Sequence, residues 1–406
     1  MSLYEERLVD KKQSNIVITI VTLSLIYQII LCFINTKIFN ISTAIVALFE
    51  FAIYALLVFS ISKKIPKYIG LMLIVFIVNF AFCFLIRGAL DPKGIRDYLI
   101  IILFFWFGYT AGNETLVNKL LLITTSIVLI IGLFEWLALD LYTQFFNTFN
   151  YYVNQSGIGA NGGAIFEGQA LTLNGFRPDG IGRTILPFIF GSHRISSVFL
   201  EPVSLGNYAV ILFIWSIAKD KLSSKIDFFI FFSSFVLIAF ADSRFGLLMF
   251  GFITVIRYLL PIALYGFISL FPIFVTLFLM FYAYYYYVGA YEDTFMGRLL
   301  ICGSRLVSLT LSDFFGFQSP LKNYGDMGYP YIISRFGILF ILFNWISLWL
   351  IPLTKSQNIR IRGFCSIYIS LILTISGSSL FALKTASILW FIVGCAMSYR
   401  NNFEKG

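Results

Sequence analysis

The segment from Arg194 to Asn207 carries a cation and a carboxylate, Arg194 and Glu201, at the point where a long polar stretch enters an apolar run. Holding ionisable groups at such a boundary of a lipid-embedded chain costs free energy, so these groups are functional candidates. A planar guanidinium group binds phosphate oxygens in a bidentate manner, which a lysine ammonium cannot do. The segment therefore predicts a site for an anionic ligand, with Arg194 as its first cation.

Three further arginines are candidates for the same site. Arg244 lies in a short polar turn between two apolar runs, and Arg298 and Arg305 share one face of a predicted helix. Converging guanidinium groups would neutralise a diphosphate without a metal and would stabilise the charge on a departing diphosphate. The alternative for each arginine is a structural role, in which its side chain reaches lipid head groups or pairs with a loop carboxylate.

Two carboxylates are candidates for proton transfer. Glu201 precedes Pro202, which favours the first position of a helix, so Glu201 is expected at the N-cap of an apolar helix. There it either caps the helix or orients Arg194 or an acceptor hydroxyl. Asp326 lies in a glycine-bounded loop just before another apolar run, where burial would raise its pKa toward that of a general base. The alternative for Asp326 is turn formation.

The remaining candidates are uncharged or weakly basic. His193 is the only histidine of the chain, and it is expected either as a hydrogen-bonded loop residue or as a base. Tyr329, His193 and Asn207 are expected to contact the sugar or acceptor. One histidine, no paired cysteines and scattered carboxylates predict neither a metal site nor a soluble cofactor. The five cysteines show no disulfide spacing and are expected to be inert apolar side chains.

The composition identifies the elements that must position these residues. Of the 406 residues 59% are hydrophobic and 12% are charged, with a mean hydropathy of +0.88, which excludes an ordinary soluble domain. Apolar runs in lipid must be helical, because the backbone polar groups there need internal partners. We therefore expect an all-α polytopic membrane protein with about twelve transmembrane helices. The predicted spans are roughly 14–34, 42–61, 67–87, 97–112, 117–139, 202–218, 226–241, 244–257, 261–282, 331–353, 363–377 and 380–398.

Lysine and arginine are distributed differently between the predicted spans, and the lysine excess predicts that both termini are cytoplasmic. The predicted inner segments contain Lys11, Lys12, Lys63, Lys64, Lys67, Lys119, Lys219, Lys221, Lys225, Lys355 and Lys405, and the outer ones only Lys37, Lys93, Lys322 and Lys384. Arginine shows the opposite trend, which also favours an anionic ligand outside. The predicted outer arginines are Arg87, Arg96, Arg177, Arg183, Arg194, Arg244, Arg298, Arg305 and Arg335.

The chain is expected to form a single integral membrane domain over residues 1–406, with two long outer loops at about 140–201 and 283–330. The first loop is rich in glycine, asparagine and aromatics, and is predicted as a lid, a saccharide contact or a plain connector. The second begins with tyrosines typical of an interfacial belt. A capped amphipathic helix lying in the membrane interface is expected after Asp293. No cleavable signal peptide is expected before the first span.

The chain resembles the O-antigen polymerase (Wzy-type) and O-antigen ligase superfamily of bacterial surface polysaccharide assembly. The resemblance rests on Arg194…Phe199-Leu-Glu201-Pro202…Gly206, on Asp242-Ser-Arg-Phe-Gly246 and on Gly325-Asp-Met-Gly-Tyr329…Gly337. The loop from Asp91 to Asp97 also fits, as does the topology. The resemblance implies an inverting, C-type glycosyltransferase architecture that uses undecaprenyl-diphosphate-linked sugars, and it implies that Arg194 and Arg244 bind the diphosphate.

The leading hypothesis is a polymerase at the outer face of the bacterial cytoplasmic membrane. It would transfer a growing glycan from one undecaprenyl diphosphate to the non-reducing end of a second lipid-linked repeat unit. Asp326 or Glu201 would be the base, while Arg194 and Arg244, with Arg298 and Arg305, would hold the diphosphate. Expected partners are the lipid-linked repeat units, the bilayer and a chain-length regulator membrane protein; no nucleic acid is expected.

Two alternatives remain open. The first is a ligase that transfers the glycan to lipid A core; ligases of the superfamily carry a histidine where this chain has Asp326, which favours the polymerase. The second is a flippase or transporter for lipid-linked sugars. Transporters place their ionisable sites near the bilayer midplane, where the sequence predicts only Glu50 and Glu135.

Overall fold

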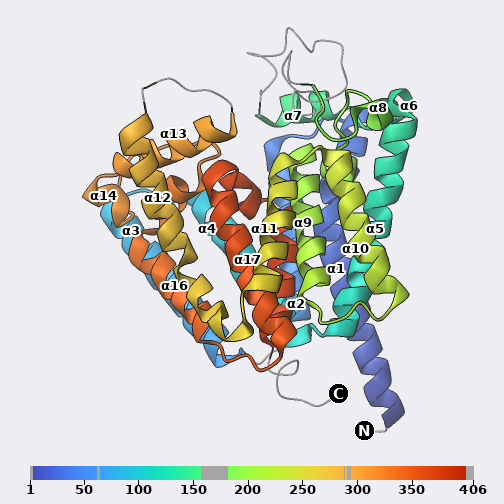
Figure 1. Cartoon of the computed structure of the whole chain (residues 1–406), viewed down its shortest axis with the longest axis horizontal. Helices are drawn as coiled ribbons and strands as arrows, with labels where there is room; N and C mark the ends of the chain where they lie inside the picture. The colour runs from blue at the N-terminus through green and yellow to red at the C-terminus, as the bar shows by residue number, and fades with distance from the viewer. Residues whose placement is uncertain (1–2, 62–64, 157–181, 288, 290–293, 399–406) are drawn as a thin grey trace. The chain divides into compact units, whose positions relative to one another are not determined.

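The computed structural model describes residues 3–61, 65–156, 182–287, 289 and 294–398. Within them every predicted apolar run is helical (Figure 1). The glycine-rich part of the first predicted loop, together with Arg177 and Asp293, lies outside the described residues. The chain divides into two compact units, and each is considered by itself below.

Unit 1 consists of Met1–Ile61, Ala111–Arg257 and Leu383–Ile388. Its long helices α1, α5, α9 and α10 lie side by side, and the short helices α6, α7 and α8 lie at one end of them (Figure 1). The elements are α1 (Leu3–Lys37), α2 (Thr43–Ser60), α5 (Glu114–Leu137), α6 (Leu139–Phe145), α7 (Thr148–Ser156), α8 (Pro187–Phe190), the 3-10 helix η3 (Ser197–Phe199), α9 (Pro202–Ala218), α10 (Lys225–Ala241), α11 (Arg244–Leu259) and the start of α18 (Leu383–Met397).

Helix α9 is the core of unit 1. Nearly all of its residues are buried, as expected for a helix that is apolar on every face. Gly206 allows close packing against the α10–α11 turn, since a Cβ there would lie 2.6 Å from Ser243 Oγ. Deeper in the unit, the Tyr208 hydroxyl bonds to the hydroxyls of Thr124 and Thr125 on α5. These three hydroxyl groups therefore satisfy one another.

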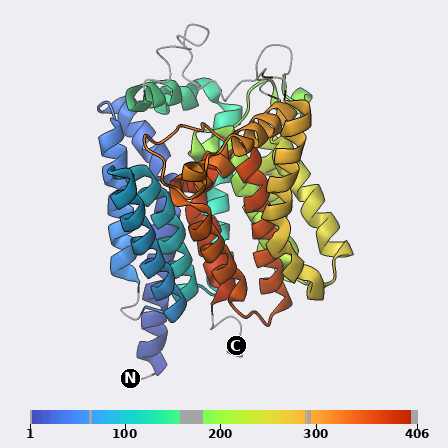
Figure 2. The same cartoon turned by 90° about the vertical axis from the view of Figure 1, so that its left-hand side faces the viewer.

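Unit 2 consists of Ser62–Thr110, Tyr258–Ala382 and Leu389–Gly406. In Figure 2 the orange α13 lies at the upper end of this unit. The elements are α3 (Lys67–Arg87), α4 (Pro92–Ala111), the 3-10 helix η4 (Ile262–Leu270), α12 (Phe271–Tyr286), α13 (Phe295–Val307), α14 (Leu311–Phe314), α15 (Gly328–Phe336), α16 (Ile338–Leu350), α17 (Ser356–Ile375), the 3-10 helix η5 (Gly377–Phe381) and the remainder of α18.

Glycines set two close helix contacts in unit 2. A Cβ at Gly108 of α4 would lie 2.0 Å from the carbonyl oxygen of Phe391, and one at Gly394 of α18 would lie 2.1 Å from that of Phe105. Likewise, a Cβ at Gly303 of α13 would lie 2.1 Å from the carbonyl oxygen of Leu279 on α12. Small residues at helix interfaces are typical of membrane proteins, because they let two backbones approach.

The span predicted over residues 331–353 is not one continuous helix. The chain forms α15 and α16 there, bent by 105° at Gly337. Gly337 has φ +78, and a Cβ on it would lie 2.6 Å from the carbonyl oxygen of Phe315. A side chain at this position would therefore be strained and would collide with the preceding loop. Hydropathy alone does not distinguish a bent pair from a continuous helix.

Seven of the described helices are long and apolar enough to cross a membrane, or up to eight if the bent pair is one span. The chain is therefore a polytopic α-helical membrane protein. Helices α9, α10, α11 and α18 are 15 to 17 residues long. A helix of 17 residues is about 25 Å long, less than the roughly 30 Å of a bilayer core. The predicted total of twelve spans stays a prediction.

Most described lysines of unit 1 lie at the opposite end from three of its arginines, with Lys384 and Arg257 among the exceptions. Lys119 lies near the start of α5, and Lys219 and Lys225 lie at the turn between α9 and α10. At the other end, where α5 and α10 finish and α9 begins, lie Arg183, Arg194 and Arg244, the last as the first residue of α11. The predicted separation of the two cations is therefore present within unit 1. Which end faces the cytoplasm stays a prediction.

Candidate functional site

The segment before α9 is built around Glu135 in the last turn of α5. Its side chain is completely buried and accepts hydrogen bonds from the Ser196 and Ser197 amides at 3.0 and 2.5 Å. It also accepts from the Ser196 hydroxyl and lies 2.8 Å from His193 Nε2. A buried carboxylate is tolerated only with such partners. Glu135 therefore lies at a helix end, and the expectation of a mid-span position was wrong.

The buried side chain of Arg183 joins the loop before α9 to the end of α10. Arg183 donates to the carbonyl oxygens of His193, Ala239 and Phe240, the last at 3.1 Å. The carbonyls of residues 239 and 240 belong to the final turn of α10, where carbonyl groups lack helical partners. Arg183, one of the predicted outer arginines, is thus occupied by the backbone. Its role is structural, but its partners are carbonyl oxygens rather than the lipid head groups or loop carboxylates of the stated alternative.

Asp242 of the Asp-Ser-Arg motif has a similar structural task. It is buried, adopts a left-handed conformation with φ 49, and ends α10. One carboxylate oxygen accepts from the Thr184 amide at 3.0 Å, the Thr184 hydroxyl at 2.8 Å and the Ile185 amide at 2.7 Å. The motif's aspartate therefore fastens the preceding loop onto the α10–α11 turn.

Arg194 and Arg244 meet this turn from different parts of the chain. Arg194 is half-buried, and its Nε donates to the carbonyl oxygen of Ala241 at 3.1 Å. Arg244 is exposed, and its guanidinium makes no hydrogen bond or ion pair with the rest of the described chain. The structure thus places these two predicted cations at one turn. Of the two, Arg244 is the one whose charge is fully presented to a ligand.

Glu201 occupies the predicted N-cap position of α9, but its side chain makes no capping hydrogen bond. Instead it accepts from Lys384 Nζ at 3.0 Å, the Ser204 hydroxyl at 3.1 Å and the Tyr152 hydroxyl at 3.1 Å. About a third of the side chain, 33%, is exposed. Burial acts to raise the pKa of Glu201, but the charge and hydrogen bond of Lys384 outweigh it and hold that pKa below its ordinary value.

Lys384 is the residue that sequence reasoning missed. It is buried at the start of α18 and donates to Gln28, to the carbonyl oxygen of Phe199 and to Glu201, at 2.9, 2.8 and 3.0 Å. Three acceptors at this distance satisfy all three donors of an ammonium group. The only sign of its role in the sequence was its position: Lys384 lies in a predicted outer segment, whereas most lysines lie in predicted inner segments.

Asn207, predicted to contact the acceptor, is buried within α9. Its amide nitrogen has no hydrogen-bond partner among the described residues. The side chain is therefore not at the surface, and the predicted contact with the sugar or acceptor stays a prediction. His193 by contrast is 11% exposed, beside the turn that carries Arg194.

The other predicted site residues belong to unit 2. Arg298 of α13 donates to the carbonyl oxygen of Ile375 at 3.0 Å and lies 3.9 Å from Asp326. Asp326 is 59% exposed, so it is not buried as expected. Arg305 is exposed on the same helix, which begins with the cap of Thr294 on the Gly297 amide. The predicted capped helix is confirmed from Phe295 onward.

Tyr329 is buried rather than presented to a sugar. Its hydroxyl donates to the carbonyl oxygen of Ser370 at 2.9 Å, and its ring lines an apolar pocket of unit 2. The neighbouring Gly328 packs against α17, since a Cβ there would lie 2.5 Å from the Leu373 side chain. Gly328 of this predicted motif is thus explained by close packing, whereas Gly325 has a positive φ of +59.

Three further outer arginines are paired within unit 2. Arg87 donates to the carbonyl oxygen of Ser334 at 3.1 Å, and Arg335 pairs with Asp91. Arg96 lies 2.6 Å from its neighbour Asp97. Much of the arginine excess therefore ties loops and helix ends together. Arg194 and Arg244 in unit 1 remain the cations best suited to a ligand.

The arrangement in unit 1 can orient a hydroxyl, hold a proton and bind an anion. Glu201 supplies an ionised acceptor, the Glu135–His193 pair supplies an imidazole in a fixed orientation, and Arg244 supplies an exposed guanidinium. Among the described residues no group of three histidine, cysteine, aspartate or glutamate side chains could hold a metal ion. No family model, no curated protein and no solved structure matches the chain.

Proposed function

We propose that the chain is a polysaccharide polymerase that joins lipid-linked repeat units at the outer face of the bacterial cytoplasmic membrane. Its support is the resemblance to the polymerase and ligase superfamily, together with one structural observation. That observation is the gathering of Arg194, Arg244, His193 and Glu201 at the lysine-poor end of unit 1. A site at a helix end lies at the depth where a lipid-linked diphosphate meets water.

In this proposal Arg194 and Arg244 bind the diphosphate of the donor. Negative charge grows on the diphosphate as the glycosidic bond to it breaks, and fixed guanidinium groups stabilise that charge. The start of α11 at Arg244 adds the positive end of a helix dipole at the same turn. The donor is already activated by its diphosphate, so the transfer itself asks for no nucleotide.

The acceptor hydroxyl must lose a proton when it attacks the sugar carbon. Glu201 is ionised at neutral pH because its pKa is lowered, so it suits hydrogen bonding to a hydroxyl rather than taking up its proton. His193 is a candidate base: Glu135 fixes its ring through Nε2, so the buried Nδ1 is the nitrogen that would have to reach the acceptor hydroxyl. Asp326 remains the second candidate.

The proposal is tested by sizing lipid-linked glycan in a deletion strain complemented with variants. Arg194→Lys and Arg244→Lys should shorten the product to single repeats, because an ammonium group loses the bidentate contact. Arg257→Lys is the matched control: it changes an arginine at the opposite end of unit 1, where Arg257 bonds to Ile217. Product of normal length from Arg194→Lys, at equal protein level, would contradict the proposal.

The same strains separate the alternatives. Long polymer that accumulates without being attached to lipid A core in the deletion strain would support the ligase. Repeat units that stay inaccessible to enzymes added outside would support the flippase. The base is identified by comparing His193→Gln with Asp326→Ala, and the variant that abolishes transfer while retaining donor binding identifies it.

A further inference from the structure

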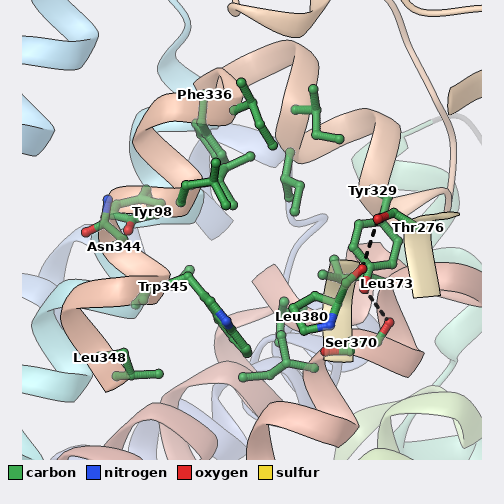
Figure 3. A pocket seen from close by; sticks show the side chains of 18 of the residues that line it. Tyr98, Thr276, Tyr329, Phe336, Asn344, Trp345, Leu348, Ser370, Leu373 and Leu380 are labelled. Carbon is green, nitrogen blue, oxygen red and sulfur yellow. Dashed lines mark hydrogen bonds between the residues drawn. The ribbon is translucent and has the colours of Figure 1, made fainter. Parts of the chain in front are cut away.

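Unit 2 contains an apolar pocket with a volume of about 190 Å³, which the proposed function does not use (Figure 3). Its walls come from eight elements: α12, α15, α16 and α17 surround it, and residues of α3, α4, η5 and α18 complete the lining. A dry cavity of about 150 Å³ is large enough to take a benzene molecule. The pocket of unit 2 can therefore hold a short length of hydrocarbon chain.

The pocket has little to offer a polar ligand. The Tyr329 hydroxyl is bonded to Ser370, and the Thr276 hydroxyl is bonded to the carbonyl oxygen of Pro272 at 3.0 Å. Among the described lining residues, two buried polar side-chain atoms have no hydrogen-bond partner: Asn344 Oδ1 and Trp390 Nε1. A sugar ring would bury several hydroxyl groups, each of which needs a partner. The lining therefore excludes a saccharide and favours hydrocarbon.

The two sides of the pocket differ in exposure. The inner wall, which includes Tyr98 and Phe336, is buried, whereas Ile273 of α12 is exposed and Trp345 of α16 is half-exposed. Outward of this rim, Leu277 and Ile346 are 59% and 52% exposed. In a bilayer such an apolar surface is covered by lipid chains. The pocket thus leads from a lipid-covered surface between α12 and α16 into the interior of unit 2.

We propose that this pocket binds the acyl chain of a bilayer phospholipid. Occupancy fills a cavity whose emptiness would cost dispersion contacts along its whole lining. It also packs the inner side of α16 just after the bend at Gly337, so the bound chain stabilises the bent pair. The site is independent of the proposed polymerase activity.

The surroundings favour a phospholipid chain over the prenyl chain of a diphosphate carrier. A carrier would need a cationic site for its diphosphate beside the pocket, and the lining contains no cation. Arg335, next to the lining residue Phe336, pairs with Asp91 and stacks 4.8 Å from the ring centre of Tyr331. Arg298, beyond the end of α17, pairs with Asp326. These two cations therefore already have carboxylate partners.

The test is photo-crosslinking of the full-length protein, reconstituted in nanodiscs with a phosphatidylcholine that carries a diazirine on one acyl chain. The expected result is label on peptides of α12 and α16 that line the pocket. Thr276→Phe, which fills the pocket from α12, should lower that label at least fivefold. Leu277→Phe is the matched control, because it adds the same ring one residue away on the exposed face.

A second variant keeps the test decisive if Thr276→Phe does not fold. Leu348→Phe fills the pocket from α16 and should lower the label similarly. In addition, adding phosphatidylcholine to delipidated protein should raise the Tm of the wild type and of Leu277→Phe, and not that of a filled variant. Equal label in all variants overturns the proposal. Loss of label when a polyprenyl phosphate is added overturns it as well, because the pocket then belongs to the carrier.

Discussion

At the scale of single residues, the ion pair of Lys384 and Glu201 best shows how this chain uses charge. The lysine is buried and fully bonded, while the carboxylate is held at one oxygen by Lys384 and Ser204 and at the other by Tyr152. A pair of this kind stabilises the fold only while it is intact. It also presents an ionised oxygen of fixed position at the end of α9. Structure and the proposed chemistry therefore depend on the same contact.

Replacing Lys384 should lower both the stability of the fold and the proposed transfer activity. Lys384→Met leaves Glu201 without its cation, and we expect a loss of about 2 kcal/mol in the free energy of unfolding, below the roughly 3–5 kcal/mol of a fully buried pair because Glu201 is partly hydrated. The double variant Lys384→Met with Glu201→Gln should recover part of it. The measurement is thermal unfolding in detergent. A single variant as stable as the wild type would show that the pair contributes nothing.

The same variant should change the response to pH. With its cation removed, the pKa of Glu201 rises, so proton uptake begins at higher pH than in the wild type. Polymer formation should then fall on acidification at a pH where the wild type is still active. The readout is transfer rate against pH in reconstituted membranes. The control is Lys384→Met combined with Glu201→Gln. Because glutamine does not titrate, the transfer rate of this double variant should not fall in that pH range.

Asp313 gives a second pH-dependent contact, outside the predicted spans. Burial acts to raise its pKa, but hydrogen bonds from Thr310 and Lys322 outweigh it and hold the pKa below its ordinary value of about 3.9. A lowered folded-state pKa means that this stabilisation is complete above the ordinary value and is lost as the pH falls through the folded one. Wild-type Tm should therefore drop below about pH 4 more steeply than that of Asp313→Asn.

The control for that experiment is a carboxylate that is largely exposed. Asp326→Asn changes an exposed side chain, so it should leave the free energy of unfolding within about 0.5 kcal/mol of the wild-type value at neutral pH. Asp313→Asn should cost about 1 kcal/mol there, because it weakens the capping box of α14. If the Tm of both variants falls below pH 4 as steeply as that of the wild type, Asp313 does not govern acid stability.

At the scale of elements, close backbone contacts decide which helices pair. The α4–α18 crossing depends on two glycines, Gly108 and Gly394, that each face a carbonyl oxygen of the other helix. Hydropathy marks both helices as apolar but contains no sign that they touch. The bend between α15 and α16 is the same kind of feature, because it depends on Gly337 meeting the loop at Phe315.

A methyl group at the α4–α18 crossing should therefore be destabilising. Gly394→Ala places its Cβ against the carbonyl oxygen of Phe105, and overpacking of this kind costs about 1–3 kcal/mol. Gly251→Ala in α11 is the matched control, since a Cβ there meets nothing within 4 Å. It should stabilise by about 0.5–1 kcal/mol through helix propensity. Unfolding in a denaturant series with the two variants in parallel measures the difference, and equal effects would refute the tight crossing.

At the scale of the whole molecule, the distribution of cations predicts an orientation. Lysines gather where α9 turns into α10, whereas α6 lies at the opposite end of the unit 1 helices, with the arginines of the candidate site (Figure 1). Cytoplasmic loops of membrane proteins are rich in positive charge. The lysine end should therefore face the cytoplasm, and the candidate site should face outward.

Cysteine labelling tests this orientation. The five native cysteines are buried and should not react with a membrane-impermeant maleimide. Gln144→Cys in α6 should be labelled in spheroplasts, and Ser223→Cys in the α9–α10 turn only after the membrane is permeabilised; both positions are exposed. Labelling of Ser223→Cys alone in intact spheroplasts would invert the topology and remove the candidate site from the outer face.

The amino-acid sequence by itself determined the class of the protein, the position of nearly every helix and the separation of lysine from arginine in unit 1. These properties follow from local composition, because a run of apolar residues in lipid has no alternative to a helix. Arg194 and Arg244 could also be identified as candidates, since charge at the edge of an apolar run is visible in the sequence.

Only the tertiary structure decided what those charges do. It assigned Arg87 and Arg183 to carbonyl oxygens, Glu135 to the segment before α9, and Lys384 to Glu201. Each of these partners is distant in sequence, and the residues around a single charged side chain do not indicate which group will pair with it. The cost of burying an unpaired charge makes the pairing obligatory. Its choice depends on which helix ends the fold brings together, as it brings α18 to the start of α9.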